Sequence, residues 1–188
     1  AIFDEMNRVL AALHGVDLDV VGLSDFGAPG AYVARQIDRW TKQYRASETE
    51  TIADMDALIT WLNDNVHLDD GQRTLVHGDW HLGQLGQTVV DPRWVLIDVD
   101  DLGVGDPAWD LARPAGFWAA GLIPDRDWDG FQAGYREARG PALPPGDPWP
   151  VLEPFARAAV IHAAASGACH DRDDATQQAL LAACERMG

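Results

Sequence analysis

The residues best suited to chemistry lie in one short segment near the middle of the chain. Residues 76–84 read VHGDWHLGQ and place two histidines, an aspartate and a glutamine directly after a short β-prone run. Polar side chains gathered in a loop on a rigid scaffold are typical of a functional site. Fourteen residues after Gln84, Asp98 follows the apolar run of residues 94–97. A hairpin between the two would return Asp98 to the neighbourhood of Gln84.

This pattern suits phosphoryl transfer. That reaction needs a carboxylate to position the acceptor hydroxyl, and oxygen ligands to hold Mg²⁺ against the phosphates. Asp79 can perform the first task. Asp98 and the amide oxygen of Gln84 can perform the second, because magnesium prefers hard oxygen donors. We therefore expect Asp79 to be the catalytic base, and Gln84 and Asp98 to bind Mg²⁺ and, through it, ATP.

The same residues allow other interpretations. Asp79 could cap its own turn, and Asp98 could simply end a strand. His77, Asp79 and His81 could instead form an H-x-D-x-H cluster for zinc or iron, because imidazole suits these metals. That cluster would indicate a metallohydrolase.

The elements that must position these residues are mostly helical, because apolar residues recur at helical spacing on both sides of the segment. Helices are expected at residues 1–14, 31–45, 51–66, 107–120, 127–138, 150–168 and 173–187. Strands are expected at residues 74–76, 87–90 and 94–97, with a turn at Asp91 and Pro92. The GVG of residues 103–105 lacks a third spaced glycine and is expected to be only a turn.

These elements predict an α+β fold that is mostly helical, with a small central β-hairpin carrying the catalytic and metal loops. A chain of 188 residues most naturally forms one domain. We expect a single domain over residues 1–188. Within it, residues 1–70 form a helical segment, 73–101 the catalytic loop and metal hairpin, and 107–188 a helical tail.

Composition excludes several classes of function. The net charge of −16 makes nucleic acid a poor partner, since such binding rests on Lys and Arg displacing counterions. No run of 18 apolar residues predicts a membrane span, and the amino terminus does not resemble a secretory signal. We expect a cytoplasmic protein. The two cysteines lie 15 residues apart, which is neither a zinc-site spacing nor a disulfide framework.

Two linked motifs resemble the aminoglycoside phosphotransferase and choline kinase family. The catalytic loop of that family is written H-G-D-x-H-x-x-N, and residues 77–84 read HGDWHLGQ. Its second motif, an apolar strand ending in I-D and then G-D-P-x-x-D-L-A, is similar to Ile97-Asp98 and the GDPAWDLA of residues 105–112. The upstream segments LAALHGVD and ARQIDRWTKQY are similar to bacterial members as well. The resemblance covers roughly residues 1–120.

The resemblance implies a kinase-like C-terminal catalytic lobe that uses Mg²⁺ and ATP to phosphorylate a small-molecule hydroxyl. Carried over by position, Asp79 is the base, and Gln84 and Asp98 are the metal ligands. His77 and Asp110 support the loop, and His81 is a neighbour of the reaction. Gln84 stands where most members have Asn, and maltokinase-like relatives also have Gln at this position.

The family's smaller N-lobe, with its glycine-rich strands and phosphate-pairing lysine, has no counterpart in these residues. The single lysine, Lys42, is expected on a helix between Arg39 and Arg45 and is a poor phosphate anchor. The enzyme would need the missing N-lobe from elsewhere. The alternative is a non-catalytic lobe that acts as a binding or dimerisation module, for instance as a homodimer.

Overall fold

The structure is a computed structural model that describes residues 2–27, 32–48, 51–65, 72–90, 93–169 and 175–187. The elements within these ranges are α1 (Ile2–His14), α2 (Tyr32–Ser47), α3 (Ala53–Asn65), β1 (Thr74–Val76), the 3₁₀ helix η2 (Leu82–Gln84), β2 (Leu85–Gln87), β3 (Trp94–Leu96), β4 (Gly103–Gly105), α4 (Ala108–Ala119), α5 (Asp125–Glu137), α6 (Trp149–Cys169) and α7 (Ala175–Met187). The prediction of a mostly helical chain with a small sheet component is confirmed. The predicted helix ends at Ala31, Val66 and Asp173 lie outside the described residues.

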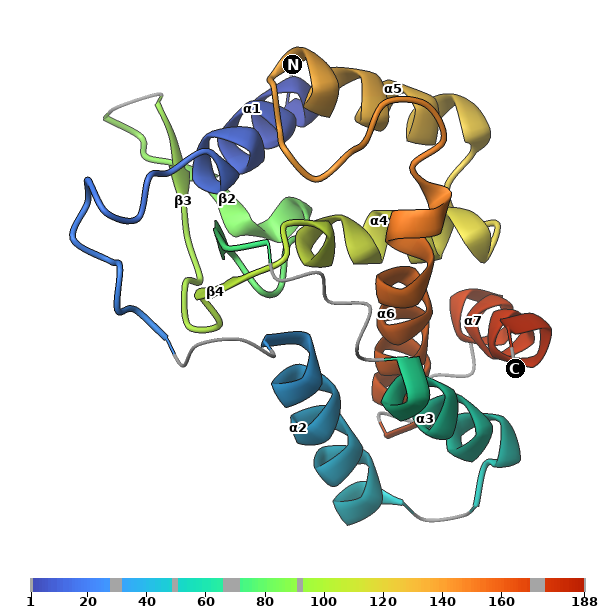
Figure 1. Ribbon diagram of the computed structural model, residues 1–188. Helices are drawn as coiled ribbons and strands as arrows, with labels where there is room; N and C mark the ends of the chain where they lie inside the picture. The colour runs from blue at the N-terminus through green and yellow to red at the C-terminus, as the bar shows by residue number, and fades with distance from the viewer. Residues whose placement is uncertain are drawn as a thin grey trace.

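The helices form two groups joined by the crossing of α4 and α6 (Figure 1). In the first group, α5 packs on α1 and α4, and α1 also contacts β1. In the second group, α6 contacts α2, α3 and α7. The crossing requires a residue without a side chain, because a Cβ at Gly116 would lie 2.7 Å from the carbonyl oxygen of Ala156.

Apolar stripes explain why these segments are helical. In α2, Val33, Ile37 and Tyr44 are buried at helical spacing. Lys42 lies on the opposite, exposed face of α2, where its Nζ is 2.6 Å from Asp38 Oδ2. The polar position predicted for Lys42 is therefore observed.

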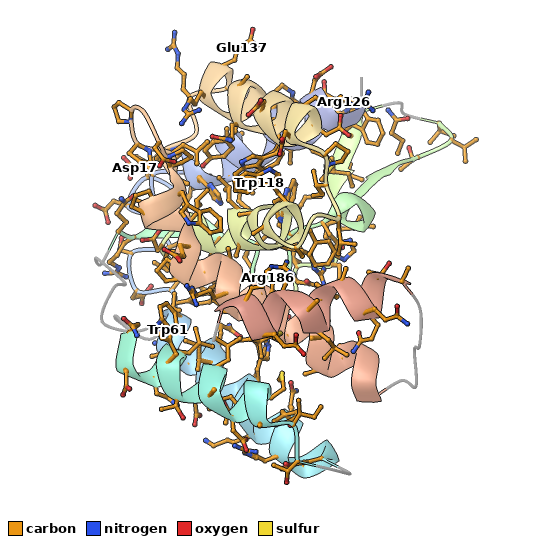
Figure 2. The ribbon with its side chains drawn as sticks, turned by 90° about the vertical axis from the view of Figure 1, so that its right-hand side faces the viewer. Asp17, Trp61, Trp118, Arg126, Glu137 and Arg186 are labelled. Atoms are coloured by element: carbon orange, nitrogen blue, oxygen red, sulfur yellow. The ribbon has the colours of Figure 1, made fainter. Side chains whose placement is uncertain are left out.

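Aromatic packing closes the first group. Trp118 of α4 stacks on Trp128 of α5 with ring centroids 5.5 Å apart, and Trp149 meets Trp118 edge-on. Figure 2 shows Trp118 inside this group, with Arg126 and Glu137 at the two ends of α5. These contacts fix the far end of α4, and its first turn lies at the catalytic loop.

The strands form two separate antiparallel pairs, β1 with β4 and β2 with β3. The prediction of a turn at residues 103–105 was wrong, because this segment is β4 and pairs with β1. The ring of Tyr32 occupies the space that a Cβ at Gly103 or Gly105 would need. The glycines therefore serve close packing of α2 on a strand, which glycine spacing alone does not reveal.

The hairpin strand β2 begins earlier than predicted. It covers Leu85–Gln87 instead of residues 87–90, because pairing starts directly after η2, where the amide of Ile97 donates to the carbonyl of Gln84 at 3.0 Å. Val89 and Val90, which had suggested a strand, are fully exposed. The predicted turn at Asp91 and Pro92 lies outside the described residues. Within the described residues, no helix is both long enough and apolar enough to cross a membrane.

Candidate active site

The catalytic loop leaves β1 at Val76 and is held in place by the first turn of α4. Asp110 accepts hydrogen bonds from the backbone amides of His77 at 2.6 Å and Gly78 at 2.8 Å. The indole of Trp109 donates to the carbonyl of Gly78 at 2.9 Å. Both backbone polar groups of Gly78 are thus satisfied by α4, which fixes the direction in which the next residue, Asp79, leaves the loop.

Position 78 requires glycine. Its φ is +92°, a conformation that other residues rarely adopt. A Cβ at this position would also collide with the carbonyl oxygen of Asp101. The glycine of the loop motif is therefore explained by geometry as well as by the resemblance.

Asp110 belongs to a buried hydrogen-bonded chain that sequence reasoning found only in part. Its Oδ2 lies 3.0 Å from Nε2 of His14, and Nδ1 of His14 lies 2.7 Å from the hydroxyl of Tyr135. Burial raises the pKa of the Tyr135 hydroxyl, so it remains a neutral donor. The arrangement suits Tyr135 donating to Nδ1 and His14 Nε2–H donating to the Asp110 carboxylate.

Asp79 is partly exposed and has a different neighbour at each carboxylate oxygen. Nη1 of Arg113 lies 3.0 Å from its Oδ1, and Nε2 of His81 lies 3.7 Å from its Oδ2. Arg113 was not predicted as a site residue. One signal could have found it, since Arg113 follows Asp110 by three residues and therefore lies on the same face of α4.

Gln84 and Asp98 lie side by side, as the hairpin predicted. Nε2 of the buried Gln84 is 3.2 Å from Asp98 Oδ2 and 3.2 Å from the backbone carbonyl oxygen of Asp79. It is also 2.9 Å from Nε2 of His81. The amide of Gln84 thus links the loop that carries Asp79 to the strand end that carries Asp98.

The side chain of His77 links the catalytic loop to the hairpin. Its Nε2 lies 3.1 Å from the carbonyl oxygen of Ile97, and its ring is buried edge-on against Trp80. The residue after Ile97 is Asp98, whose φ of +58° is unusual for a residue other than glycine. The hydrogen bond from His77 therefore restrains the backbone immediately before this strained aspartate.

Asp98 supplies carboxylate oxygens, the donor that magnesium prefers, and kinases commonly hold this ion with one or two protein groups plus phosphates and waters. Gln84 faces Asp98 with Nε2, so its amide would have to turn over to offer Oε1 to the ion. Asp98 is exposed, so phosphate and water could reach it. Magnesium is therefore compatible with the residues that the loop and the hairpin bring together.

The alternative of a transition-metal cluster is not supported. Among the described residues, no group of three or more His, Cys, Asp or Glu side chains could hold a metal ion. His77 is fully buried and points to Ile97, while His81 bonds to the amide of Gly83 and to Gln84. The three residues of the H-x-D-x-H pattern do not converge on one point.

A small cavity of about 30 Å³ opens at Asp79, between the catalytic loop, α2, α4 and α6. Trp40, Trp109 and His162 line it together with Arg113. Its volume leaves room for a water molecule or a substrate hydroxyl. Asp79 therefore faces a space where a reacting group could sit.

The fold and the loop geometry together define a kinase-like phosphotransferase lobe. The model of the family described as "Phosphotransferase enzyme family" matches residues 1–155, and the chain belongs to that family. A structure described as an aminoglycoside phosphotransferase from Ralstonia eutropha aligns with a TM-score of 0.70 and 30% identity. The alignment covers 99% of this chain and 64% of that one.

Further relatives differ in name and length. Acyl-CoA dehydrogenase family member 10 of Mus musculus is 44% identical over 117 residues, which are 60% of this chain and 10% of the relative. Acyl-CoA dehydrogenase family member 11 of Rattus norvegicus is 36% identical over 63% of this chain and 15% of its own length. An ethanolamine kinase of Plasmodium vivax shares the fold, with a TM-score of 0.60 at 13% identity over 98% of this chain and 58% of that one. The chain spans a small part of the curated relatives and under two thirds of the solved ones.

Proposed function

We propose that this chain is the catalytic lobe of an ATP-dependent phosphotransferase that transfers the γ-phosphoryl group to a hydroxyl of a small molecule. One observation carries the proposal: the backbone carbonyl of Asp79 and the carboxylate of Asp98 meet at the amide of Gln84. Its Nε2 is 3.2 Å from the backbone oxygen of Asp79 and 3.2 Å from Asp98 Oδ2. Membership of a phosphotransferase family supports the same reaction class.

In the proposed reaction, Asp79 receives the proton of the acceptor hydroxyl. The hydroxyl oxygen forms a bond to the γ-phosphorus, the bond from that phosphorus to the bridging oxygen breaks, and ADP leaves. The Arg113 guanidinium, 3.0 Å from Oδ1, holds the Asp79 carboxylate in one orientation. Since the hydrogen bond from Arg113 goes to Oδ1, Oδ2 can face the substrate.

Gln84 and Asp98 would hold Mg²⁺, which when bound neutralises charge on the phosphates of ATP. His77 and Asp110 act on the backbone instead of on the reactants. Asp110 binds two consecutive amides of the loop, and His77 binds the carbonyl that precedes Asp98. Together they fix the position of Asp79 relative to Gln84 and Asp98.

The acceptor is proposed only as a hydroxyl compound. The related proteins are named for aminoglycosides, ethanolamine and acyl-CoA dehydrogenation, so their names do not converge on one substrate. The smaller lobe that supplies glycine-rich strands and a lysine in such kinases is not among these 188 residues. Whether this chain binds ATP by itself is therefore part of the test.

The experiment is a calorimetric titration of ATP in the presence and absence of Mg²⁺. We expect magnesium-dependent binding that weakens at least tenfold in Asp98→Ala, a loss of about 1.4 kcal/mol. Asp100→Ala is the matched control, because this aspartate is also exposed and lies two residues from Asp98, but is not one of the proposed metal ligands. Binding that is equal in wild type and Asp98→Ala would contradict the metal assignment.

A second candidate is a non-catalytic binding or dimerisation module. It is favoured by exposed apolar side chains on the hairpin and the segment after it, namely Val89, Val90, Val95, Ile97 and Val99. Exposed apolar groups beside one another are typical of interaction surfaces. No binding of ATP with Mg²⁺, together with a dimer in analytical ultracentrifugation, would favour this module over the enzyme.

A further inference from the structure

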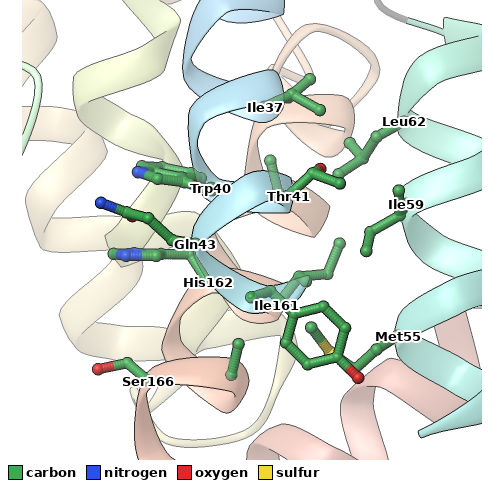
Figure 3. A pocket seen from close by; sticks show the side chains of 13 residues that line it. Ile37, Trp40, Thr41, Gln43, Met55, Ile59, Leu62, Ile161, His162 and Ser166 are labelled. Atoms are coloured by element: carbon green, nitrogen blue, oxygen red, sulfur yellow. The ribbon is translucent and has the colours of Figure 1, made fainter. Parts of the chain in front are cut away.

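A cleft of about 200 Å³ lies within the second helix group, between α2, α3 and α6 (Figure 3). It is distinct from the catalytic loop and from the GDPAWDLA motif, and part of its lining comes from the upstream segment of residues 34–44. Its walls come from the consecutive helices α2 and α3 and from α6, which lies far from both in the sequence. Besides Trp40, the larger apolar and aromatic side chains in the walls are Ile37, Tyr44, Met55, Ile59, Leu62 and Ile161.

The lining is apolar with a small polar fraction. Figure 3 shows Ile37, Ile59 and Leu62 facing one another across the cleft, with Thr41 between them and Ser166 toward the edge. Protein interiors are normally packed without gaps of this size, since each unfilled space forfeits contacts. An apolar cleft with a few polar groups at its margin has the character of a small-molecule site.

The cleft adjoins the cavity at Asp79. Trp40 and His162 line both the cleft and the smaller cavity at the catalytic loop. Their rings stack with centroids 4.1 Å apart and planes inclined by 10°, so they form a flat partition between the two spaces. A molecule with its hydroxyl at Asp79 could extend along this partition into the cleft.

We infer that the cleft binds an uncharged apolar group of the acceptor, while the acceptor hydroxyl faces Asp79. Only the position of the acceptor hydroxyl at Asp79 rests on the proposed function. A cavity of about 150 Å³ holds one benzene, so the present volume suits roughly six to eight carbons. Burial lowers the pKa of His162, so the partition presents a neutral imidazole to such a group at pH 7.

The probes are 1-hexanol and 1,6-hexanediol, which share a carbon chain but differ in the polarity of one end. Calorimetry should show saturable binding of 1-hexanol and at least tenfold weaker binding of the diol. Ala165→Leu places a larger side chain in the cleft and should weaken 1-hexanol binding at least tenfold. Ala163→Leu is the matched control, because Ala163 is also partly buried on α6 but lines neither space, and should change binding less than twofold.

Thr41→Phe fills the cleft from α2 and serves as a second variant if Ala165→Leu does not fold. The inference is overturned if 1-hexanol shows no saturable binding, or if the filling variants bind it as well as Ala163→Leu does. The two proposals fail separately. If the protein binds 1-hexanol but transfers no phosphoryl group, the cleft proposal stands and the enzyme proposal fails. If it transfers phosphoryl to ethanol but does not bind 1-hexanol, the enzyme proposal stands and the cleft proposal fails.

Discussion

At the residue scale, the two oxygens of Asp79 have different surroundings. Oδ1 accepts a hydrogen bond from Arg113 at 3.0 Å, whereas Oδ2 has a longer contact with His81, at 3.7 Å. A carboxylate paired on one side and open on the other is oriented without being blocked. This division of labour is what a base that accepts a proton from a substrate needs.

Asp79→Asn should test that role directly. Asparagine keeps the shape and can still contact Arg113 through its amide oxygen, but it cannot take up the hydroxyl proton. We expect the rate of phosphoryl transfer to fall by about 10²–10⁴-fold, with magnesium-dependent ATP binding retained. Steady-state kinetics beside the ATP titration checks this, and Asp100→Asn serves as control. A rate within twofold of wild type would show that Asp79 is not the base.

Site residues that lie in a short sequence motif could be predicted from the sequence. Residues whose role depends on a contact with a distant segment could not. Asp79, Gln84 and Asp98 follow from motif letters and from a hairpin that returns the chain, and the structure does bring them together. His14 reaches Asp110 across 96 positions in the sequence. No local pattern marks such a partner, because only the packing of α1 and α5 on the core creates it.

At the element scale, α4 organises the site. Its first two turns supply Trp109, Asp110 and Arg113, which bind the loop backbone and the Asp79 carboxylate. The helices around it were predictable in number and approximate position, because their apolar spacing is regular. The strand β4 was missed, since its three residues are two glycines around one valine and its pairing with β1 depends on contacts made by α2.

Gly78→Ala should be costly for two separate reasons, and a second glycine separates them. Gly121 has a similar φ of +79°, but no atom within 4 Å would meet an added Cβ. Gly121→Ala should therefore cost only the strained conformation, about 1–3 kcal/mol. Gly78→Ala adds the collision with Asp101 and should cost at least about 3 kcal/mol. Urea unfolding of both variants measures the difference, and equal losses would contradict the close approach of the loop to Asp101.

At the scale of the whole molecule, stability should depend on the protonation of His162. Burial lowers the pKa of this imidazole below its ordinary value of 6.5, and nearby Arg113 lowers it further. Below pH 6.5 the unfolded chain binds this proton more readily than the folded one. Stability is therefore complete above pH 6.5 and falls as the pH drops toward the folded pKa, by up to about 1.4 kcal/mol per pH unit.

Urea unfolding at pH 7.5 and pH 5.5 compares wild type with His162→Gln, which cannot gain this charge. The loss of stability on acidification should be smaller in His162→Gln, because carboxylates titrate in both proteins and cancel in the comparison. An equal loss in the two proteins would mean that His162 is as easily protonated in the folded state as in the unfolded one.

The hydrogen-bonded chain from Tyr135 through His14 to Asp110 has a consequence for inherited or engineered variation. It couples α1 and α5 to the backbone amide of His77, two residues before Asp79. If Asp79 is the base, a substitution at either end of this chain should lower the rate of phosphoryl transfer through the position of the loop. Substitutions at positions 14 and 135 should therefore be grouped by their effect with substitutions in the loop, and not with those at other buried positions.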